Sequence, residues 1–202
     1  MNADTRTRIV MTAMELFWEK GFQSTSIADI LSRSQVHSGS LYHFFPGKQD
    51  VLIAVLEAYR DGIDEWLLAP AWTGVDDPID RIFALLDGYR VQLVTTECTY
   101  GCPIGSLALE LHEPDLRVRQ LLAENFANWT KAIARCLEAA GDRLPVRLDR
   151  MQFAEFVLTV MEGAIMQART YRDVEAFDRN VAMLRAHVDM LIAQARNERV
   201  PA

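Results

Sequence analysis

The sequence predicts an all-helical protein in which an N-terminal three-helix region precedes a larger helical C-terminal region. Apolar residues recur three and four positions apart along most of the chain, which is the period of one face of an α-helix. No segment alternates apolar and polar residues as a half-buried strand does. Glycine and proline interrupt the pattern at points that fit the ends of helices.

Three short helices are predicted before about residue 50. The first has an apolar stripe of four residues, and Gly21 ends it. The stripe consists of Ile9, Ala13, Leu16 and Phe17. A second helix covers about residues 27–33, and its candidate N-caps are Ser24, Thr25 and Ser26. The third helix contains Leu41 and stops at Pro46, because proline does not continue a helix.

The remaining chain is predicted to form amphipathic helices separated by loops, and the one at about 104–112 is short. They cover about residues 48–68, 78–95, 104–112, 114–140, 148–171 and 174–195. The stretch APAWTGVDDP, residues 69–78, is predicted to be a linker because it holds two Pro, a Gly and two Asp. We expect one domain at residues 1–50 and another at 51–202, with the helix at 48–68 connecting them.

Composition limits the classes of function. The formal net charge of −7 argues against general attraction to polyphosphate, so a nucleic-acid site has to be local. No apolar run approaches the roughly 18 residues of a membrane span, and no signal-peptide core is visible, which predicts a cytoplasmic protein. The three cysteines lack zinc-ligand spacing and do not form a disulfide framework. We therefore expect no metal and no cofactor.

One window of the acidic chain is free of carboxylates. No Asp or Glu occurs between Ile30 and Gln49. Val36 marks a tight break between two short helices, and Leu41 and Phe45 point inward one helical turn apart, as in a helix-turn-helix. The residues left facing outward are Ser38, Gly39, Ser40, Tyr42 and His43. Small and hydrogen-bonding residues without nearby acids suit duplex DNA, although a solvated polar surface remains the alternative.

The order of residues in this region resembles the N-terminal domain of the TetR/AcrR family of transcriptional regulators. The resemblance rests on TAMELF at residues 12–17, GF at 21–22, TSIADI at 25–30 and GSLYHFFP at 39–46, followed by Lys48. It covers about residues 5–59. The family fold is an all-helical dimer with an N-terminal helix-turn-helix DNA-binding domain and a C-terminal ligand-binding and dimerisation domain.

The resemblance implies a set of DNA-contacting residues. Thr25 and Ser26 would contact phosphate, and Lys48 would anchor one. The recognition surface would contain Gln35, Ser38, Gly39, Ser40, Tyr42 and His43. The chain departs from the family pattern at Ser34-Gln35, where Ala-Gly is common, and at Ser38, where Lys or Arg is frequent. His37 stands where a capping Ser or Asn is usual, which leaves the cap of the third helix open.

The last two predicted helices carry apolar residues at heptad-like spacing, which suggests a dimer interface. The interface candidates are Phe153, Val157, Val160, Ala164, Phe177, Val181, Leu184, Val188 and Leu191. Gly163 would allow close approach of a partner helix. The alternative is that both stripes face the core of their own subunit. A homodimer is expected because a helix-turn-helix reader normally binds two half-sites.

A regulator also needs an effector site, and aromatic and methionine side chains are suitable walls for one. The candidates are Trp66, Phe83, Tyr89, Tyr100, Cys102, Phe126, Trp129, Phe156, Met161 and Met166. Most such residues are simply core in helical proteins. GCPIGSLALEL, residues 101–111, resembles a TetR subgroup with a cysteine at this point, some members of which respond to oxidants or electrophiles. Cys102 is therefore a candidate sensor with Cys98 as a resolving thiol, or else a packing residue.

Together these features predict a dimeric repressor that binds palindromic operator DNA and is released by a small molecule, or alternatively by modification of Cys102. An all-helical enzyme is the less favoured alternative, because no nucleophile-base pair or paired carboxylates stand out. A helical adaptor that does not bind DNA is a further alternative, which salt-sensitive duplex binding would separate from a regulator.

Overall fold

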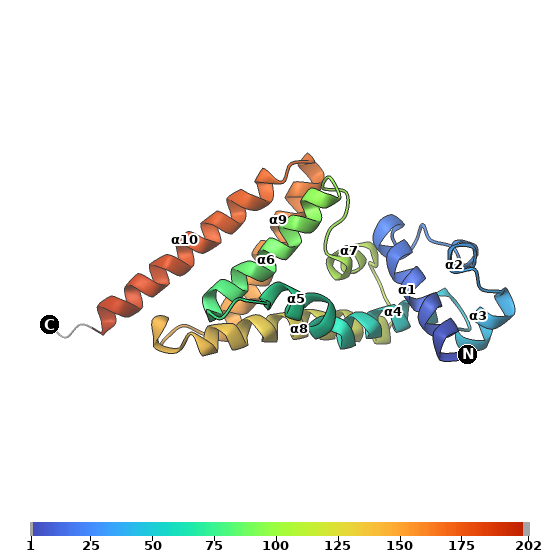
Figure 1. Ribbon diagram of the computed structural model, residues 1–202, viewed down its shortest axis with the longest axis horizontal. Helices are drawn as coiled ribbons and strands as arrows, with labels where there is room; N and C mark the ends of the chain where they lie inside the picture. The colour runs from blue at the N-terminus through green and yellow to red at the C-terminus, as the bar shows by residue number, and fades with distance from the viewer. Residues whose placement is uncertain (1, 200–202) are drawn as a thin grey trace. The chain divides into compact units, whose positions relative to one another are not determined.

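The computed structural model describes residues 2–199, with side chains from Thr5 onward, and this part is helical with connecting turns (Figure 1). The α-helices are α1 (Asn2–Lys20), α2 (Ile27–Ser34), α3 (Ser38–Phe44), α4 (Lys48–Ile63), α5 (Ala69–Trp72), α6 (Pro78–Thr95), α7 (Pro103–Glu110), α8 (Leu116–Ala139), α9 (Arg150–Tyr171) and α10 (Glu175–Glu198). A π-helical segment, η1 (Asp64–Leu68), follows α4, and a 3-10 turn, η2 (Gly141–Arg143), follows α8. The predicted all-α fold class is confirmed.

The chain divides into two compact units. Unit 1 comprises Met1–Gly62 and Pro103–Phe126, and unit 2 comprises Ile63–Cys102 and Ala127–Ala202. Each unit is discontinuous in sequence, because α7 and the first half of α8 group with the N-terminal helices. The division into residues 1–50 and 51–202 concerns function and stays a prediction.

Unit 1 is built on α1, against which α2, α3 and α7 pack. The predicted apolar stripe of α1 lies in the core, where Ile9 and Ala13 are fully buried. Gly21 ends the helix in the left-handed region at φ 84°, where glycine avoids the strain that a side chain would add. Ser26 caps α2 in a reciprocal capping box with Asp29, so Ser26 is the N-cap among the three sequence candidates.

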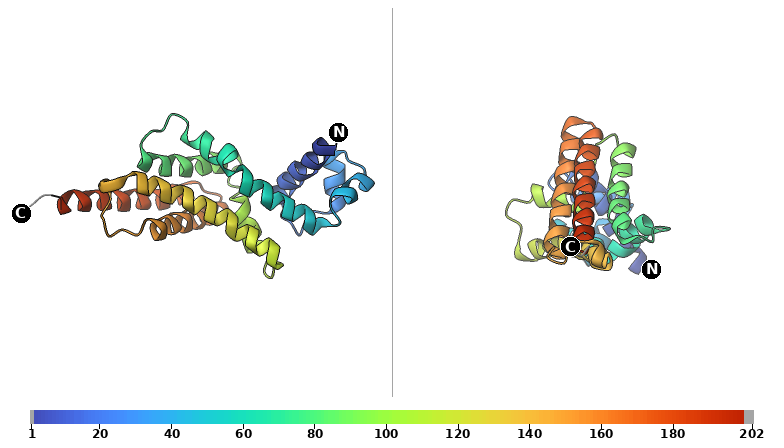
Figure 2. Two further views of the ribbon diagram at one scale, coloured as in Figure 1. Left: turned by 90° about the horizontal axis from the view of Figure 1, so that it is seen from below. Right: turned by 90° about the vertical axis from the view of Figure 1, so that its left-hand side faces the viewer.

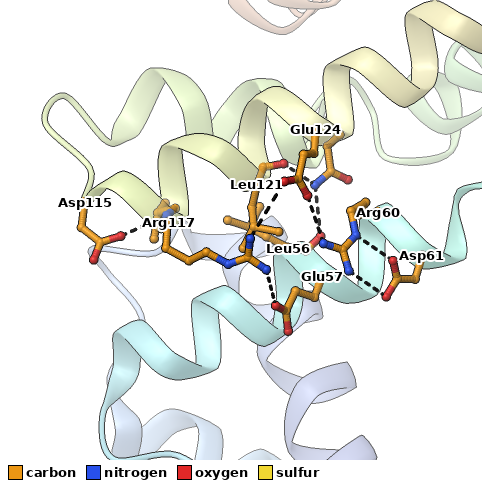
Figure 3. A network of polar contacts seen from close by, with 10 residues as sticks. Leu56, Glu57, Arg60, Asp61, Asp115, Arg117, Leu121 and Glu124 are labelled. Carbon is orange, nitrogen blue, oxygen red and sulfur yellow. Dashed lines mark hydrogen bonds and ion pairs between the residues drawn. The ribbon is translucent and has the colours of Figure 1, made fainter.

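A polar network fastens the start of α8 to α4 within unit 1 (Figure 3). Its ion pairs are Arg60–Glu124 at 3.0 Å and Arg117–Glu57 at 2.7 Å. At its centre the Asn125 side-chain amide donates to the Leu56 carbonyl oxygen at 3.0 Å and to the Leu121 carbonyl oxygen at 2.8 Å. Asn125 is 7% exposed, so these bonds are shielded from water.

We expect Asn125→Ala to lower the free energy of unfolding by about 1–2 kcal/mol, because it removes two buried hydrogen bonds and leaves a small cavity. Urea unfolding followed by circular dichroism measures this change. Gln120→Ala is the matched control, because Gln120 is exposed on the same helix. Equal unfolding midpoints for the two variants would show that the Asn125 bonds contribute nothing net.

Unit 2 is built around α9 and α10, which are joined by a tight turn and pack along each other, with α6 against both (Figures 1 and 2). Asp77 and Asp149 cap α6 and α9, each accepting two backbone N–H bonds in the first turn. Arg172 adopts the left-handed conformation at the end of α9, which reverses the chain into α10. No helix in residues 2–199 is both long and apolar enough to cross a membrane.

The region around the predicted linker is more helical than its composition suggested. Helical structure continues past Leu68 through α5 to Trp72, so the predicted linker at residues 69–78 shrinks to residues 73–77. Pro70 lies at the start of α5, directly after the π-helical segment η1. The π-helical segment η1 also changes the helical register of this stretch, which a pattern of apolar residues does not reveal.

Candidate functional site

The helix-turn-helix in unit 1 is formed by α2 and α3, with residues 35–37 between them. Gln35 takes the left-handed conformation at φ 53°. Glycine is the residue that the resemblance leads one to expect at this position. Val36 is 8% exposed and fills the corner, while Leu41 and Phe45 are 0% and 3% exposed. The apolar residues that sequence analysis placed inside the motif therefore do form its core.

The outward face of this motif presents the predicted recognition residues. Gln35, Ser38, Gly39, Ser40, Tyr42 and His43 are all exposed. A shallow polar depression of about 350 Å³ is lined by Thr5, Gly39, Ser40, His43 and Phe44. A Cβ added to Gly39 would meet no atom within 4 Å, so packing within the chain does not require glycine there. No Asp or Glu lines this depression or lies on α3.

Two residues to which the resemblance assigned phosphate contacts are engaged within the chain instead. Thr25 is fully buried, and its hydroxyl donates to the Gly21 carbonyl oxygen at 2.7 Å. Its side chain is closed to phosphate, which corrects the expectation for Thr25. The Lys48 ammonium donates to the carbonyl oxygens of Phe22 at 2.9 Å and Thr25 at 3.0 Å. A phosphate contact by Lys48 stays a prediction, but these bonds give the ammonium a structural role.

The N-terminal ends of α2 and α3 are capped differently. The exposed Ser26 hydroxyl donates to the Asp29 carboxylate at 2.6 Å and accepts from the Asp29 N–H at 3.0 Å. Its predicted phosphate contact would have to be made alongside this capping box. His37 is the N-cap of α3 and makes no side-chain capping bond. No cap side chain therefore satisfies the first N–H groups of α3, although the Ser40 N–H donates to the His37 carbonyl oxygen at 3.0 Å.

A buried polar cluster in unit 2 contains three of the predicted effector residues and one that sequence analysis missed. Tyr89 of α6, Cys102, Trp129 of α8 and Glu162 of α9 form this cluster, here called the Tyr89 cluster. Tyr89, Cys102 and Trp129 are each at most 6% exposed. A lone acid within the apolar run FVLTVMEGAIM was the available signal for Glu162.

The Tyr89 cluster holds polar groups that burial makes costly. Burial raises the pKa of the Tyr89 hydroxyl well above its usual value, and nearby Cys102 and Glu162 act in the same direction. Burial also raises the pKa of Glu162, while a hydrogen bond from Cys102 opposes the rise. The Trp129 indole N–H and Oε1 of Glu162 are buried without hydrogen-bond partners among the described residues. The indole acts on the Tyr89 hydroxyl from nearby, outside hydrogen-bonding geometry.

We expect Glu162→Gln to raise the free energy of unfolding by about 1 kcal/mol at pH 7, since it removes a poorly solvated charge. A raised folded-state pKa means that folding opposes ionisation of Glu162. The cost is therefore complete above the folded-state pKa and absent below the ordinary carboxyl pKa of 4.5. The gain should therefore vanish in acid, which urea unfolding at several pH values measures. Glu155→Gln, at an exposed position of α9, should show no such dependence.

The other predicted effector residues do not gather in this cluster. Met161 is fully buried on α9, and Tyr100 is half-buried in the loop before Cys102. Phe83 lines an open groove of about 530 Å³ between α6 and α10, where Arg185 stacks over its ring. Trp66, Phe156 and Met166 are 44–54% exposed on the surface of unit 2. Phe126 is half-buried and belongs to unit 1.

Most of the predicted dimer seam is buried inside the chain. Six of its members, Phe153, Val157, Ala164, Phe177, Leu184 and Val188, are at most 6% exposed. They lie on α9 and α10, which pack against each other, while Val160, Val181 and Leu191 are half-buried. The heptad-like spacing marked a buried face correctly, but the covering helices belong to the same subunit. The outward faces of these helices carry other apolar residues, namely Phe156, Met166, Met183 and Met190.

The cysteines are also buried, and none of the three is in a disulfide. Cys98, Cys102 and Cys136 are 5–6% exposed. Burial and the neighbouring Asp173 carboxylate raise the pKa of the Cys98 thiol, which opposes thiolate formation. Cys102 precedes α7 and donates to Glu162. Neither thiol is openly accessible in this conformation, which favours the packing alternative for the resting state.

Comparison with known proteins assigns the family. Residues 9–55 match the domain described as bacterial regulatory proteins, tetR family. Residues 78–198 match the C-terminal domain of LmrA/YxaF-like transcriptional regulators. An HTH-type transcriptional regulator of Mycobacterium tuberculosis is 31% identical, with 86% of this chain and 88% of that protein aligned.

Two further proteins are similar over nearly their whole length. The HTH-type transcriptional repressor NemR of Escherichia coli is 26% identical over 94% of each chain, and the crystal structure of its reduced form has a TM-score of 0.78, covering 93% of this chain and 96% of that chain. A regulatory protein TetR from Rhodobacter sphaeroides shares the fold with a TM-score of 0.79 and 24% identity, covering 88% of this chain and 95% of that one. The chain thus belongs to the TetR family of helix-turn-helix transcriptional regulators.

Proposed function

We propose that the protein is a homodimeric repressor that binds a palindromic operator through α3 and leaves it when a small effector binds unit 2. The observation that carries this proposal is the exposed, acid-free surface of α3, supported on a fully packed core. This surface suits close approach to phosphates and base edges, because it carries exposed hydroxyls, a histidine and a glycine that packing within the chain does not require. The similar protein NemR is named a repressor, which supports repression over activation.

A dimer follows from the need to read two half-sites, about 34–36 Å apart or a multiple of that. Its proposed interface is the outward face of α9 and α10, not the seam inferred from spacing. Phe156, Met183 and Met190 are 47%, 72% and 62% exposed there. Gly163 lies on the same helix as Phe156, and a Cβ at this position would meet nothing within 4 Å. A glycine inside a helix is destabilising by itself, so its presence favours close packing by a partner helix.

The Tyr89 cluster is the proposed effector site. Among the described residues, the Trp129 N–H has no acceptor and Oε1 of Glu162 has no donor, so a ligand that offers an acceptor and a donor would satisfy both groups. The effector must prefer the conformation that does not bind DNA, since a ligand with equal affinity for both states shifts nothing. In Trp129→Phe and Glu162→Gln we expect the effector no longer to release the protein from DNA, while the affinity for DNA without effector stays unchanged.

The second candidate trigger is oxidation of Cys102, and its hydrogen bond to Glu162 is the observation that favours it. Hydrogen peroxide would convert the thiol to a sulfenic acid with release of water, and the larger polar group would no longer fit beside Glu162. Because Cys102 is 6% exposed, this reaction requires local opening. If Cys102→Ser releases DNA on peroxide treatment as readily as the parent does, the oxidation route is excluded.

Fluorescence anisotropy on duplexes that flank the protein's own gene tests DNA binding. We expect tight binding that weakens steeply with salt, as phosphate contacts require. Duplexes selected from fragmented genomic DNA extend the search if the flanking DNA does not bind. Failure of the chain to enrich any duplex would overturn the proposed function.

A further inference from the structure

The turn between α1 and α2 is held by a carboxylate from a distant part of the sequence. Glu110, the last residue of α7, accepts the backbone N–H of Phe22 at 2.9 Å and that of Gln23 at 2.6 Å. These charge-assisted bonds join segments that are 88 and 87 residues apart, and both segments belong to unit 1. Such bonds are about twice as strong as neutral ones.

The same turn is held from its carbonyl side by Lys48. Its ammonium donates to the carbonyl oxygens of Phe22 and Thr25 and lies 4.3 Å from the centre of the Phe22 ring. The N–H and C=O of Phe22 are therefore each fixed by a charged side chain, one on α7 and one on α4. The buried Thr25 hydroxyl completes the turn by binding the Gly21 carbonyl.

Gly21 shows how closely the carboxylate approaches the backbone. A Cβ at this position would lie 2.9 Å and 3.0 Å from the two oxygens of Glu110. Its φ of 84° disfavours a side chain independently. Helix stability does not explain the acid either, because a negative charge at the C-terminal end of α7 opposes the helix dipole. The placement of Glu110 serves the turn and not its own helix.

We propose that Glu110 is a positioning residue for DNA recognition, fixing the turn that sets the start of α2 and thereby the orientation of the helix-turn-helix. Ser26, the N-cap of α2, follows this turn directly, and α2 carries α3 through the corner at Val36. Its two hydrogen bonds described above go to backbone N–H groups, so the carboxylate acts on the turn through the backbone. This inference rests on the proposed DNA-binding function.

The test compares Glu110→Gln with Glu113→Gln in the full-length protein. Glu113 is exposed three residues later, so its substitution removes the same charge without touching the turn. The probe is the duplex that the parent protein selects from fragmented genomic DNA, with a scrambled duplex of equal length for non-specific binding. We expect Glu110→Gln to weaken specific binding about tenfold, the size of losing one charge-assisted bond. Glu113→Gln should leave specific binding within about twofold.

Whether DNA affinity rises or falls in Glu110→Gln distinguishes a loss of positioning from a loss of negative charge. Removing a negative charge reduces repulsion of phosphates, so a pure charge effect strengthens binding to both duplexes. Positioning weakens specific binding and leaves binding to the scrambled duplex equal or stronger. Glu110→Asp keeps the charge but shortens the reach, and it should resemble Glu110→Gln. Specific affinity unchanged from the parent in both Glu110 variants would overturn the inference.

Amide hydrogen exchange of peptides covering residues 20–26 provides a readout that does not need DNA. Exchange at Phe22 and Gln23 should quicken several-fold in Glu110→Gln and stay at the parent rate in Glu113→Gln, when exchange is measured well below the melting temperature of every variant so that global unfolding does not contribute. Unchanged exchange in Glu110→Gln would also overturn the inference. If the parent protein selects no duplex while this exchange difference is present, the proposed DNA-binding function fails, but the stabilisation of the turn by Glu110 is supported.

Discussion

Replacing Gly39 with alanine is expected to weaken specific DNA binding at least tenfold while slightly stabilising the chain. Gly39 lies in the first turn of α3, on the surface proposed to face DNA, and a Cβ there would meet no atom of the protein within 4 Å. Alanine is the better helix former by up to about 1 kcal/mol. Loss of binding with a gain in stability would locate the requirement for glycine in the DNA complex.

The matched control is Gly88→Ala. Gly88 lies in α6 and is equally open, so it should gain similar stability without any effect on DNA binding. Anisotropy titrations and urea unfolding measure the two quantities for each variant. If Gly39→Ala binds the selected duplex as tightly as the parent does, α3 does not approach DNA closely at this residue, and the recognition surface must be redrawn.

Placing glutamate at both Phe156 and Met183 is expected to split the proposed dimer and to reduce operator affinity at least about 100-fold. Both side chains are exposed on the outward face of α9 and α10, so the double variant should still fold. Four carboxylates would then meet at a symmetric interface, which is unfavourable. Reading two half-sites with separate subunits forfeits the gain from linked binding, which reaches 10²–10⁴-fold.

Sedimentation equilibrium gives the direct readout, a change from twice the chain mass of 22.9 kDa to that mass. Val146→Glu is the control, because Val146 is 89% exposed in the loop before α9 and lies outside the proposed interface. A double variant that remains dimeric would exclude this face as the interface. A parent protein that sediments as a monomer would exclude the dimer itself.

The sequence alone was sufficient for most of the helices and for the helix-turn-helix. Local signals such as the stripe of α1, Gly21 after it and Pro78 at the start of α6 depend on residues close together in the chain, and all appear in the structure as expected. The acid-free exposed face of α3 was visible for the same reason, because helical spacing decides which side of a short amphipathic helix faces outward.

Tertiary structure decided the contacts between distant residues. Spacing showed that Phe153, Leu184 and Val188 face a core, but only packing showed that the core lies within the chain. Thr25 looked available for phosphate until its hydroxyl was found bound to Gly21. Glu162 drew no attention in the sequence, because the cost of burying a carboxylate depends on which neighbours surround it.

Glu110 is the clearest example of a contact that the sequence does not reveal. In the sequence it is one acid among several near the end of a predicted helix, whereas in the structure it binds two amides nearly ninety residues away. Periodicity reports which side of a helix is apolar, and that property is local. Which backbone groups a side chain reaches is set by the path of the whole chain. The sequence by itself therefore determined most of the helices and the helix-turn-helix, and only the fold determined which contacts hold the helix-turn-helix in place.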